Sequence, residues 1–437
     1  MDLNMHKKLK KERNRRLFFS HFAAGIKRMV VNPWLLIIVV LYIIAFINAW
    51  NSRGMLLEFG SLQLSQFLEY CYNGVLIITG VWILVWIVSF IGTPLGANTI
   101  NRALWRVGLR NDAGESPYLL TKYKYLKNTK ITVMEFEANG LAREAWERKL
   151  LSLEKVLNLN IVKVVDGKCK RRILMHTVPA RSSLPSRLQW KDEYLSNESF
   201  VLVLGESLMG QVTIDISTTP HTLLGGSTGS GKSVLLKSLV MQCVKKGATV
   251  WIADFKGGVD FPAVWQEKCC FITSESDLKN ALTTIIEELE RRRKLLIKAE
   301  CPDIDEFNQS ATKTLPHIVL ACDEVAEILD KNGLSKEQKE RIAKVESALS
   351  FLARQGRAFG IHLILATQRP DATILTGQIK SNIGNRICGR GDSILSQIIL
   401  DTTMAADKIP KDEQGLFTLC DGTIFKGYMI DKQSAFK

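Results

Sequence analysis

The sequence contains nine cysteines, but no two form a C-x-x-C pair and no histidines cluster near them. Structural zinc sites and disulfide frameworks depend on such spacings, so both are excluded, and scattered thiols are typical of a reducing cytosol. Internal repeats and low-complexity tracts are also lacking. With 437 residues, 46% of them hydrophobic, the chain is long enough for two or three domains, which excludes a disordered tail protein.

Charged residues are missing from two long stretches near the N-terminus. None lies between Arg28 and Arg53, and a second charge-free run covers residues 75–95. A spanning helix needs about 20 apolar residues, and tryptophans near its ends favour the headgroup region. The pattern predicts a two-helix transmembrane hairpin over residues 34–96. A signal peptide is the alternative interpretation, but the charged leader is too long and a second span follows at once.

Basic residues are concentrated before the first span. Residues 1–33 form a basic tail with nine Lys and Arg and two acids, a net charge of +7, whereas Arg53 is the one basic residue of the connecting segment 51–74. The positive-inside rule therefore places both termini in the cytoplasm. Half of the chain's net charge of +14 is thus explained by topology and anionic lipid, not by nucleic acid.

The rest of the chain divides by pattern into three segments. Residues 97–130 are basic and irregular, which favours a juxtamembrane linker whose charges are solvated or face lipid. Residues 131–216 combine short strand patterns with one helical stretch and predict a small α+β subdomain. From 217 to 437, apolar strands alternate with helices, which predicts an α/β fold with a mainly parallel sheet.

A glycine-rich loop follows the first apolar strand of this segment. It has the complete pattern G-x-x-x-x-G-K-S, and a helical stretch follows it. Such a loop turns backbone N–H groups and a helix N-terminus toward phosphates, while its lysine reaches the β and γ phosphates and its serine binds Mg²⁺. The pattern predicts an ATP site with Mg²⁺ bound at Ser233. The nucleotide-binding residues that it predicts are Gly226, Ser227, Thr228, Gly229, Ser230, Gly231, Lys232, Ser233 and Val234.

Further candidate residues stand at the ends of later strands. The strand 318–322 is followed by Asp323, which is expected to hold Mg²⁺ through water, and Glu324, which is expected to polarise the attacking water. A helix cap is the alternative interpretation of this acid pair. The strand 362–367 ends in Gln368, whose amide can sense the γ-phosphate or orient the water.

Asp254 and Lys256 follow the second apolar strand and are predicted on the same carboxyl edge of the sheet, where open α/β sheets bind ligands. A local ion pair explains these two residues equally well.

Several segments together resemble the FtsK/SpoIIIE family of DNA-pumping ATPases. They are the run from Thr219 to Ser233, the strand ending in Asp323-Glu324, and the segment from Arg357 to Pro370. The resemblance covers roughly residues 195–430. It implies a RecA-like P-loop motor that forms a homo-hexameric ring, threads double-stranded DNA and uses ATP.

The resemblance also implies an arginine finger, an arginine that completes the ATP site of the neighbouring subunit. The candidates are Arg386 and Arg390, which follow the third core strand. An ordinary ion pair is the alternative interpretation of either residue. We take Arg386 as the candidate finger. The predicted catalytic residues are Lys232, Asp323, Glu324, Gln368 and Arg386.

Departures from the family pattern narrow the expected function. Chromosome translocases of this family typically have four spans, a long linker and a C-terminal winged-helix module, whereas this sequence has two spans and ends at Lys437. That shape, with the segments 354–357 and 368–371, is closer to the TcpA-like coupling proteins of Gram-positive conjugative elements. The resemblance implies an ATPase in the bacterial cell membrane that receives DNA from a relaxase and feeds it to a type IV secretion channel.

Other functions stay open as alternatives. A segregation translocase of the FtsK/SpoIIIE type shares the motor, and a protein-secretion ATPase would usually string several ATPase modules, whereas one P-loop occurs here. A non-catalytic scaffold would be expected to lose Lys232 or Glu324, and an ABC transporter would carry an LSGGQ-like signature. The charged helix expected around 287–298 is interpreted as a solvated outer face, not as a DNA contact.

Overall fold

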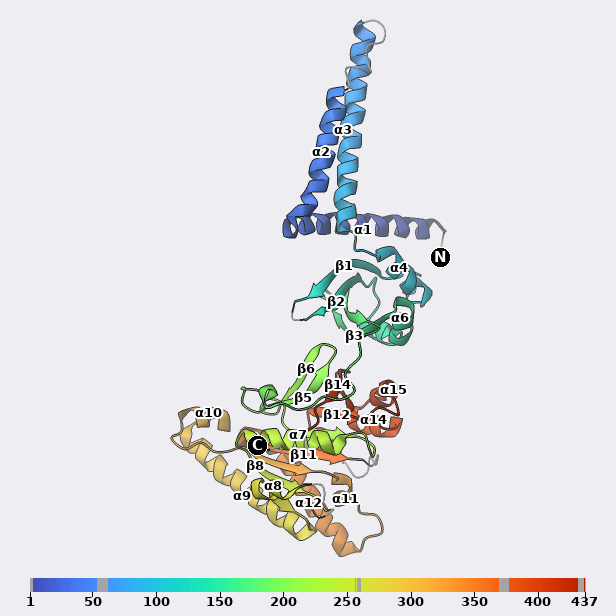
Figure 1. Cartoon of the computed structure of the whole chain (residues 1–437). Coiled ribbons are helices and arrows are strands. Elements are labelled where there is room, and N and C mark those ends of the chain that lie inside the picture. Colours follow the sequence, from blue (N-terminus) through green and yellow to red (C-terminus); the bar gives the residue numbers. More distant parts are fainter. Residues whose placement is uncertain are drawn as a thin grey trace. The chain divides into compact units, whose positions relative to one another are not determined.

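The computed structural model describes residues 3–52, 62–126, 128–255, 257, 261–368, 377–430 and 436. The chain divides into two compact units, Met1–Ser182 and Ser183–Lys437 (Figure 1). Of the residues named above, Arg53, Lys256, the segment 369–371 and Lys437 lie outside the described residues.

The first unit begins with helices. The basic tail folds as α1 (Leu3–Val31), and η1 (Pro33–Leu35), α2 (Leu36–Asn51) and α3 (Leu62–Gly92) follow. Two helical segments, Pro33–Asn51 and Gln66–Gly92, are long and apolar enough to cross a membrane, judged by length and composition. None of the first apolar window and 17% of the second is buried, so most of these apolar side chains face outward. The expected pair of apolar helices is therefore present.

Helix α1 contacts the end of α3 closely. Arg28 Nη1 donates to the carbonyl oxygens of Ile91, at 2.9 Å, and Thr93, at 3.3 Å, which have no partner within the helix. A Cβ atom on Gly25 would lie 2.0 Å from the carbonyl oxygen of Val88, and one on Gly92 would lie 1.7 Å from that of His21. Glycine is therefore required at both positions of this crossing.

A small domain of residues 97–182 completes the first unit. It consists of α4 (Ala97–Arg106), β1 (Tyr118–Tyr125), β2 (Asn128–Glu137), α5 (Arg143–Glu147), α6 (Leu150–Leu157), β3 (Leu159–Asp166) and β4 (Arg172–Pro179). The four strands form an antiparallel sheet in the order β1-β2-β4-β3. The helices pack against this sheet around a buried core that includes Leu104, Phe136, Trp146, Leu153 and Met175.

The observed division differs from the one expected from the sequence. The presumed linker 97–130 contains α4 and β1, and the second unit begins near residue 183 instead of 217. The strands β5 (Val201–Ser207) and β6 (Gly210–Asp215), expected in the small subdomain, join the large sheet. Their position depends on the antiparallel pairing of β5 with the distant β14 (Ile424–Gly427), which no local pattern reveals.

The second unit, which we call the motor, is built on a ten-stranded sheet in the order β6-β5-β14-β13-β12-β7-β11-β10-β8-β9. Neighbouring strands from β12 to β9 run parallel, and those from β6 to β12 pair antiparallel. The remaining strands are β7 (Thr222–Gly225), β8 (Thr249–Ala253), β9 (Cys270–Ile272), β10 (Ile318–Cys322), β11 (Ile361–Thr367), β12 (Asn385–Gly389) and β13 (Leu416–Leu419). The expected α/β fold with a largely parallel sheet is confirmed.

Helices cover both faces of the motor sheet (Figure 1). One face packs against α7 (Lys232–Lys245) and α8 (Ala263–Lys268). The other face packs against α9 (Glu275–Ala299), α11 (Val325–Leu329), α12 (Lys336–Gln355), α13 (Gly377–Lys380), α14 (Ser393–Leu400) and α15 (Met404–Lys408). In β10, Leu320 and Cys322 join the second core while Val319 and Ala321 join the first, so the strand is apolar throughout.

Helix α9 includes the charged stretch 287–298. Arg291 is exposed, as expected, but Arg293 is half-buried and donates to Gln355, and Arg292 is buried, with 2% of its surface exposed. Its guanidinium donates to Glu288 and to the carbonyl oxygens of Phe359 and Pro316 at 2.8 Å each. Hydrogen bonds from Arg291 and Arg292 lower the pKa of Glu288 to about 2. One residue of this charged stretch therefore joins α9 to the sheet.

Candidate nucleotide-binding site

The predicted P-loop joins β7 to α7 at the carboxyl edge of the parallel sheet. Gly229 and Gly231 adopt φ angles of 74° and 96°, in the left-handed region that glycine tolerates. A Cβ atom on Gly226 would lie 2.4 Å from Ser230 Oγ. The first N–H groups of α7 have no acceptor within the helix, which makes its N-terminus suited to an anion.

Three predicted residues meet beside this loop. Lys232 Nζ donates to the carbonyl oxygen of Asp323 at 2.5 Å and to Asp323 Oδ1 at 3.1 Å. Ser233 Oγ donates to the same Oδ1 at 3.1 Å. The side chains of Lys232 and Asp323 are 3% and 5% exposed, and at such burial the ion pair fixes both groups in place.

Glu324 faces the end of β11. Its carboxylate accepts from Thr367 Oγ1 at 2.8 Å and from the backbone N–H of Gln368 at 3.0 Å. Glu324 stands at the N-cap position of α11, but its side chain makes no capping hydrogen bond. The alternative interpretation of this acid as a helix cap is therefore not supported. Gln368 Oε1 in turn accepts from Thr228 Oγ1 at 2.9 Å, which links β11 to the P-loop.

Asp254 follows β8 on the same edge. It is 3% exposed, and the N–H of the adjacent Asp323 lies 3.3 Å from the carbonyl oxygen of Ala253. The structure thus brings Asp254 next to Asp323, whereas its predicted companion Lys256 lies outside the described residues.

Arg390 lies against the P-loop of its own chain. Its carbonyl oxygen accepts from Ser227 N and Ser227 Oγ at 2.8 and 2.9 Å, and its guanidinium donates to the carbonyl oxygens of Thr228 and Lys411. From the sequence, Arg390 was a candidate arginine finger, and its contact with the P-loop of its own chain was not predicted. The parallel pairing of β12 with β7 brings Arg390 to the loop. A strand as short as β12 carries no hydrophobic pattern from which this pairing could be predicted.

Arg386 lies at the other end of β12. Its guanidinium forms an ion pair with Asp401 and donates to the carbonyl oxygens of Lys380, at 2.9 Å, and Ile383, at 3.2 Å. In the single chain this arginine is therefore held by the ordinary ion pair that the sequence left open. Its role as a finger toward a neighbouring subunit stays a prediction.

The C-terminal hairpin of β13 and β14 covers the P-loop. Gly415 N donates to the carbonyl oxygen of Ser230 at 2.8 Å, and Gly427 N donates to that of Gly415 at 2.8 Å. A Cβ atom on Gly231 would lie 3.1 Å from Gly415. A cavity of about 160 Å³ lies between the hairpin and the start of α7, next to Gly231, Val234, Gln414, Tyr428 and Met429.

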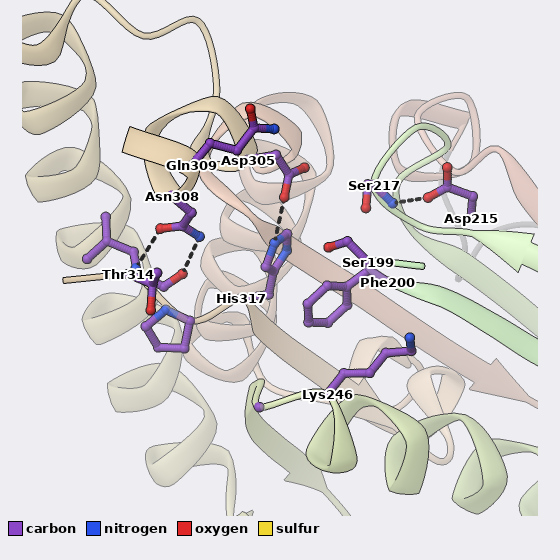
Figure 2. A pocket seen from close by; sticks show the side chains of 13 residues that line it. Ser199, Phe200, Asp215, Ser217, Lys246, Asp305, Asn308, Gln309, Thr314 and His317 are labelled. Atoms are coloured by element: carbon purple, nitrogen blue, oxygen red, sulfur yellow. Dashed lines mark hydrogen bonds and ion pairs between the residues drawn. The ribbon is translucent and has the colours of Figure 1, made fainter. Parts of the chain in front are cut away.

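A second cavity, of about 700 Å³, opens at the amino ends of the parallel strands, away from the P-loop (Figure 2). His317 lies in its wall between Asp305, whose Oδ1 is 3.2 Å from Nε2, and His362, whose Nε2 is 2.9 Å from Nδ1. Burial lowers the pKa of His317. The cavity is also lined by Asp215 and Lys246, so its acids outnumber its lysine, and a polyphosphate is disfavoured there.

The motor matches known proteins in sequence. The model of the FtsK/SpoIIIE family matches residues 186–372, which include the P-loop, Asp323, Glu324 and Gln368. DNA translocase FtsK of Helicobacter pylori (strain J99) is 32% identical over 238 residues, which are 51% of this chain and 27% of the relative. DNA translocase FtsK of Treponema pallidum (strain Nichols) is 35% identical over 225 residues, 48% of this chain and 26% of the relative. The chain spans about a quarter of the length of these curated relatives.

A solved structure matches over most of the chain. The pCW3 conjugation coupling protein TcpA, in its monomer form with ATPγS, is 32% identical with a TM-score of 0.58. The match covers 78% of this chain and 97% of that chain. Two findings thus agree, a family model over the nucleotide site and a shared structure over most of the chain. By its P-loop ATPase domain, the chain belongs to the FtsK/SpoIIIE family.

Proposed function

We propose that this chain is a membrane-anchored, ATP-driven DNA translocase that acts as the coupling protein of a conjugative type IV secretion channel. The observation that carries the proposal is the match to the coupling protein TcpA over nearly all of that chain at 32% identity. The agreement of sequence and fold over so much of both chains favours this function over the segregation and protein-secretion alternatives.

ATP is proposed to bind with its phosphates on the backbone N–H groups of residues 226–234. Lys232, now paired with Asp323, would exchange part of that ion pair for the β and γ phosphates. The cavity beside Val234 and Tyr428 would receive the nucleoside because it adjoins the start of α7.

Mg²⁺ is proposed to bind through Ser233 and Asp323, whose oxygens lie 3.1 Å apart. The donor set fits, because Mg²⁺ in nucleotide sites takes one or two protein oxygens besides the phosphates. When bound, the ion neutralises phosphate charge. Within the described residues, no group of three or more His, Cys, Asp or Glu side chains could form an all-protein metal site.

Hydrolysis is proposed to depend on two residues, one after β10 and one after β11. Glu324 would accept the proton of the attacking water, and Gln368, which bonds to Thr228, would orient that water near the γ-phosphate. Arg386 would complete the site of a neighbouring subunit in a homo-oligomeric ring, proposed as a hexamer, after leaving Asp401. Arg390 would hold the P-loop in shape.

The two apolar helices are proposed to anchor the motor in the bacterial cell membrane, with both termini and the ATPase domain in the cytoplasm. The nine basic residues before the first span support this orientation. A relaxase that delivers DNA and the channel proteins that receive it are the expected partners.

ATP hydrolysis by the full-length chain in neutral-lipid nanodiscs tests the proposal. The measurement uses duplex DNA, single-stranded DNA and no DNA, each at two salt concentrations. We expect DNA to stimulate hydrolysis, and the stimulation to weaken with salt because phosphate contacts release counterions. Lys232→Ala should abolish hydrolysis and conjugative transfer, whereas Lys245→Ala, a change in the last turn of the same helix, should preserve both. Hydrolysis by an oligomer that ignores DNA would contradict a DNA translocase and favour protein secretion.

A further inference from the structure

The basic charge of the chain is unevenly divided between its structural parts. The motor, residues 183–437, holds 31 Lys and Arg against 32 Asp and Glu, a net charge of −1. The small domain, residues 97–182, holds 17 against 8, a net charge of +9. Apart from the basic helix α1, the positive excess of the chain therefore lies in the small domain and not in the motor.

Few cations of the small domain are neutralised by carboxylates. Among its described residues, three arginines form ion pairs: Arg143, Arg171 and Arg172. The described lysines of the β1–β2 hairpin form none. An unpaired cation on an exposed strand is available to an external anion without first losing a partner.

Three of these lysines lie toward the turn of the hairpin, and we call the surface that they form the lysine face: Lys122, Lys124 and Lys130. β1 is an edge strand, and Lys124 lies opposite Thr132 on β2. Because side chains alternate along a strand, Lys122 and Lys124 project on the same side about 7 Å apart. Lys130 lies two residues before Thr132, inside the register shift that separates the Lys124–Thr132 pair from the Tyr125–Asn128 pair. All three lysines are exposed, and Lys124 Nζ donates to Thr132 Oγ1 at 3.3 Å.

The acids of the hairpin lie on the other face. Glu135 and Glu137 occupy the alternate positions of β2, where they pair with Arg172 and Arg171. Tyr123, 47% exposed, also belongs to that face, because it stands opposite Val133. The strand pleat thus separates the charges, and the lysine face has cations without acids.

We propose that the lysine face binds the phosphate backbone of DNA and adds an electrostatic hold on the substrate outside the motor, whose net charge is −1. This inference rests on the proposed function as a DNA translocase. Lysines that contact phosphates do not read bases, so the hold is independent of sequence, as a substrate that moves past requires. The lysine face would thus contact DNA outside the ATPase domain.

An anionic membrane surface presents similar phosphate chemistry. Basic segments close to a membrane span bind such surfaces by charge alone, and Leu126, in the turn of the hairpin, is 98% exposed. We commit to DNA because the motor, which would act on DNA, has no net positive charge of its own. The lipid alternative is an outcome of the test below.

Binding of labelled DNA by the full-length chain, in phosphatidylcholine nanodiscs without nucleotide, tests the inference. Affinity for a short duplex and for the matching single strand is measured over a range of salt. The variant Lys122→Gln/Lys124→Gln/Lys130→Gln should reduce the slope of log affinity against log salt by about 2.7 for duplex and about 2 for single strand, because each phosphate contact contributes roughly 0.9 or 0.7. Its ATP hydrolysis without DNA should stay at the wild-type rate.

The matched control removes three exposed lysines from α12: Lys336→Gln/Lys339→Gln/Lys344→Gln. It changes the net charge equally and should leave the slope unchanged. An unchanged slope in the hairpin variant, or an equal fall in the control, overturns the inference while the proposed function stands. Absence of DNA binding by the wild type overturns both. Weaker binding to phosphatidylglycerol vesicles, with the DNA slope unchanged, assigns the lysine face to lipid and also overturns the inference.

Discussion

The motor and the small domain both fold around a sheet, but they treat charge in opposite ways. In the motor, buried cations are matched within the fold, as Lys232 is with Asp323 and Arg292 is with Glu288. In the small domain, the lysines of the β1–β2 hairpin are exposed and, among the described residues, lack carboxylate partners. A site for one nucleotide needs a few charged side chains fixed in a buried region of low dielectric constant, whereas a surface for a long polyanion needs several exposed charges.

A substitution in the small-domain core should distinguish the unfolding of the two units most clearly. Trp146 is fully buried and packs against Phe136 with ring centroids 5.1 Å apart, so Trp146→Ala should cost about 3 to 5 kcal/mol. In calorimetry of the full-length chain, we expect the small-domain transition to fall by more than about 10 °C or to disappear. The transition that ATPγS raises, that of the motor, should remain. Leu151→Ala, at a position 69% exposed, is the control, and a fall of both transitions together would show that the units unfold as one.

Removal of one acid should stop the motor without affecting its nucleotide affinity. Glu324→Gln keeps an acceptor for Thr367 and Gln368 but removes the proton-accepting carboxylate, so we expect hydrolysis to fall about 100- to 1000-fold while ATPγS binds normally. Steady-state turnover and equilibrium binding measure the two effects. Glu327→Gln, three residues away and exposed, should hydrolyse ATP at the wild-type rate. Wild-type turnover in the Glu324 variant would show that another residue accepts the proton of the attacking water.

Acid should destabilise the motor through its buried histidines. His221 Nδ1 accepts from Leu363 N at 2.9 Å and Nε2 lies 3.0 Å from the carbonyl oxygen of Ala353, which fits the neutral ring. Burial lowers the pKa of His221 from 6.5 to about 4. Between these values the unfolded chain binds more protons, so the free energy of unfolding falls as pH falls, by about 1.4 kcal/mol per unit and about 3 kcal/mol in total.

Denaturant unfolding of the motor between pH 8 and 4.5 measures this loss, to which burial of His317 and His362 adds because it lowers the pKa of both. His221→Asn should flatten the profile, since asparagine tolerates the φ of 66° at this position. His176→Asn, in the small domain, should leave the motor profile unchanged. A motor stability that does not depend on pH over this range would contradict the assignment of a neutral ring.

Arg386, in β12, and Arg390, directly after it, should differ in a smaller but diagnostic way. Arg390→Lys keeps the charge but loses part of the contact with Thr228 and Lys411, so we expect ATPγS affinity to fall about tenfold. Arg386→Lys should leave affinity unchanged and reduce hydrolysis by the oligomer if it is the finger. Equal nucleotide affinity in both variants would remove Arg390 from the site.

The sequence predicted the central part of the motor because its signals are local. β8, β10 and β11 are apolar runs followed by polar residues, and β7 leads directly into the contiguous P-loop pattern. The roles assigned to Ser233, Asp323 and Glu324 stay predictions, although the structure brings these residues to one edge. The predicted pair of apolar helices and the α/β fold followed from equally local patterns.

The rest depended on contacts between distant segments. The strands β12, β13 and β14 are four or five residues long and carry little pattern, so the contact of Arg390 with Ser227 was not predictable. The pairing of β5 with β14 spans most of the motor and moved the domain boundary. The segment expected to be a basic linker contains α4 and β1. It was not predicted as folded because its apolar residues are spaced among basic ones, and they form one buried face only in the small-domain core.

The segment that enters the motor sets a path for mechanical load. Trp190 N donates to the carbonyl oxygen of Met429, whose own N–H donates to that of Leu188, so the entering chain is fastened to the C-terminal segment. The hydrogen bonds of Gly415 continue from that hairpin to Ser230 in the P-loop. Tension on residues 183–190 would therefore reach the phosphate-binding loop through this short chain of hydrogen bonds. A conformational change at that loop would be transmitted back to residues 183–190 by the same path. The phosphate-binding loop and the segment that leads to the membrane anchor are thus mechanically coupled.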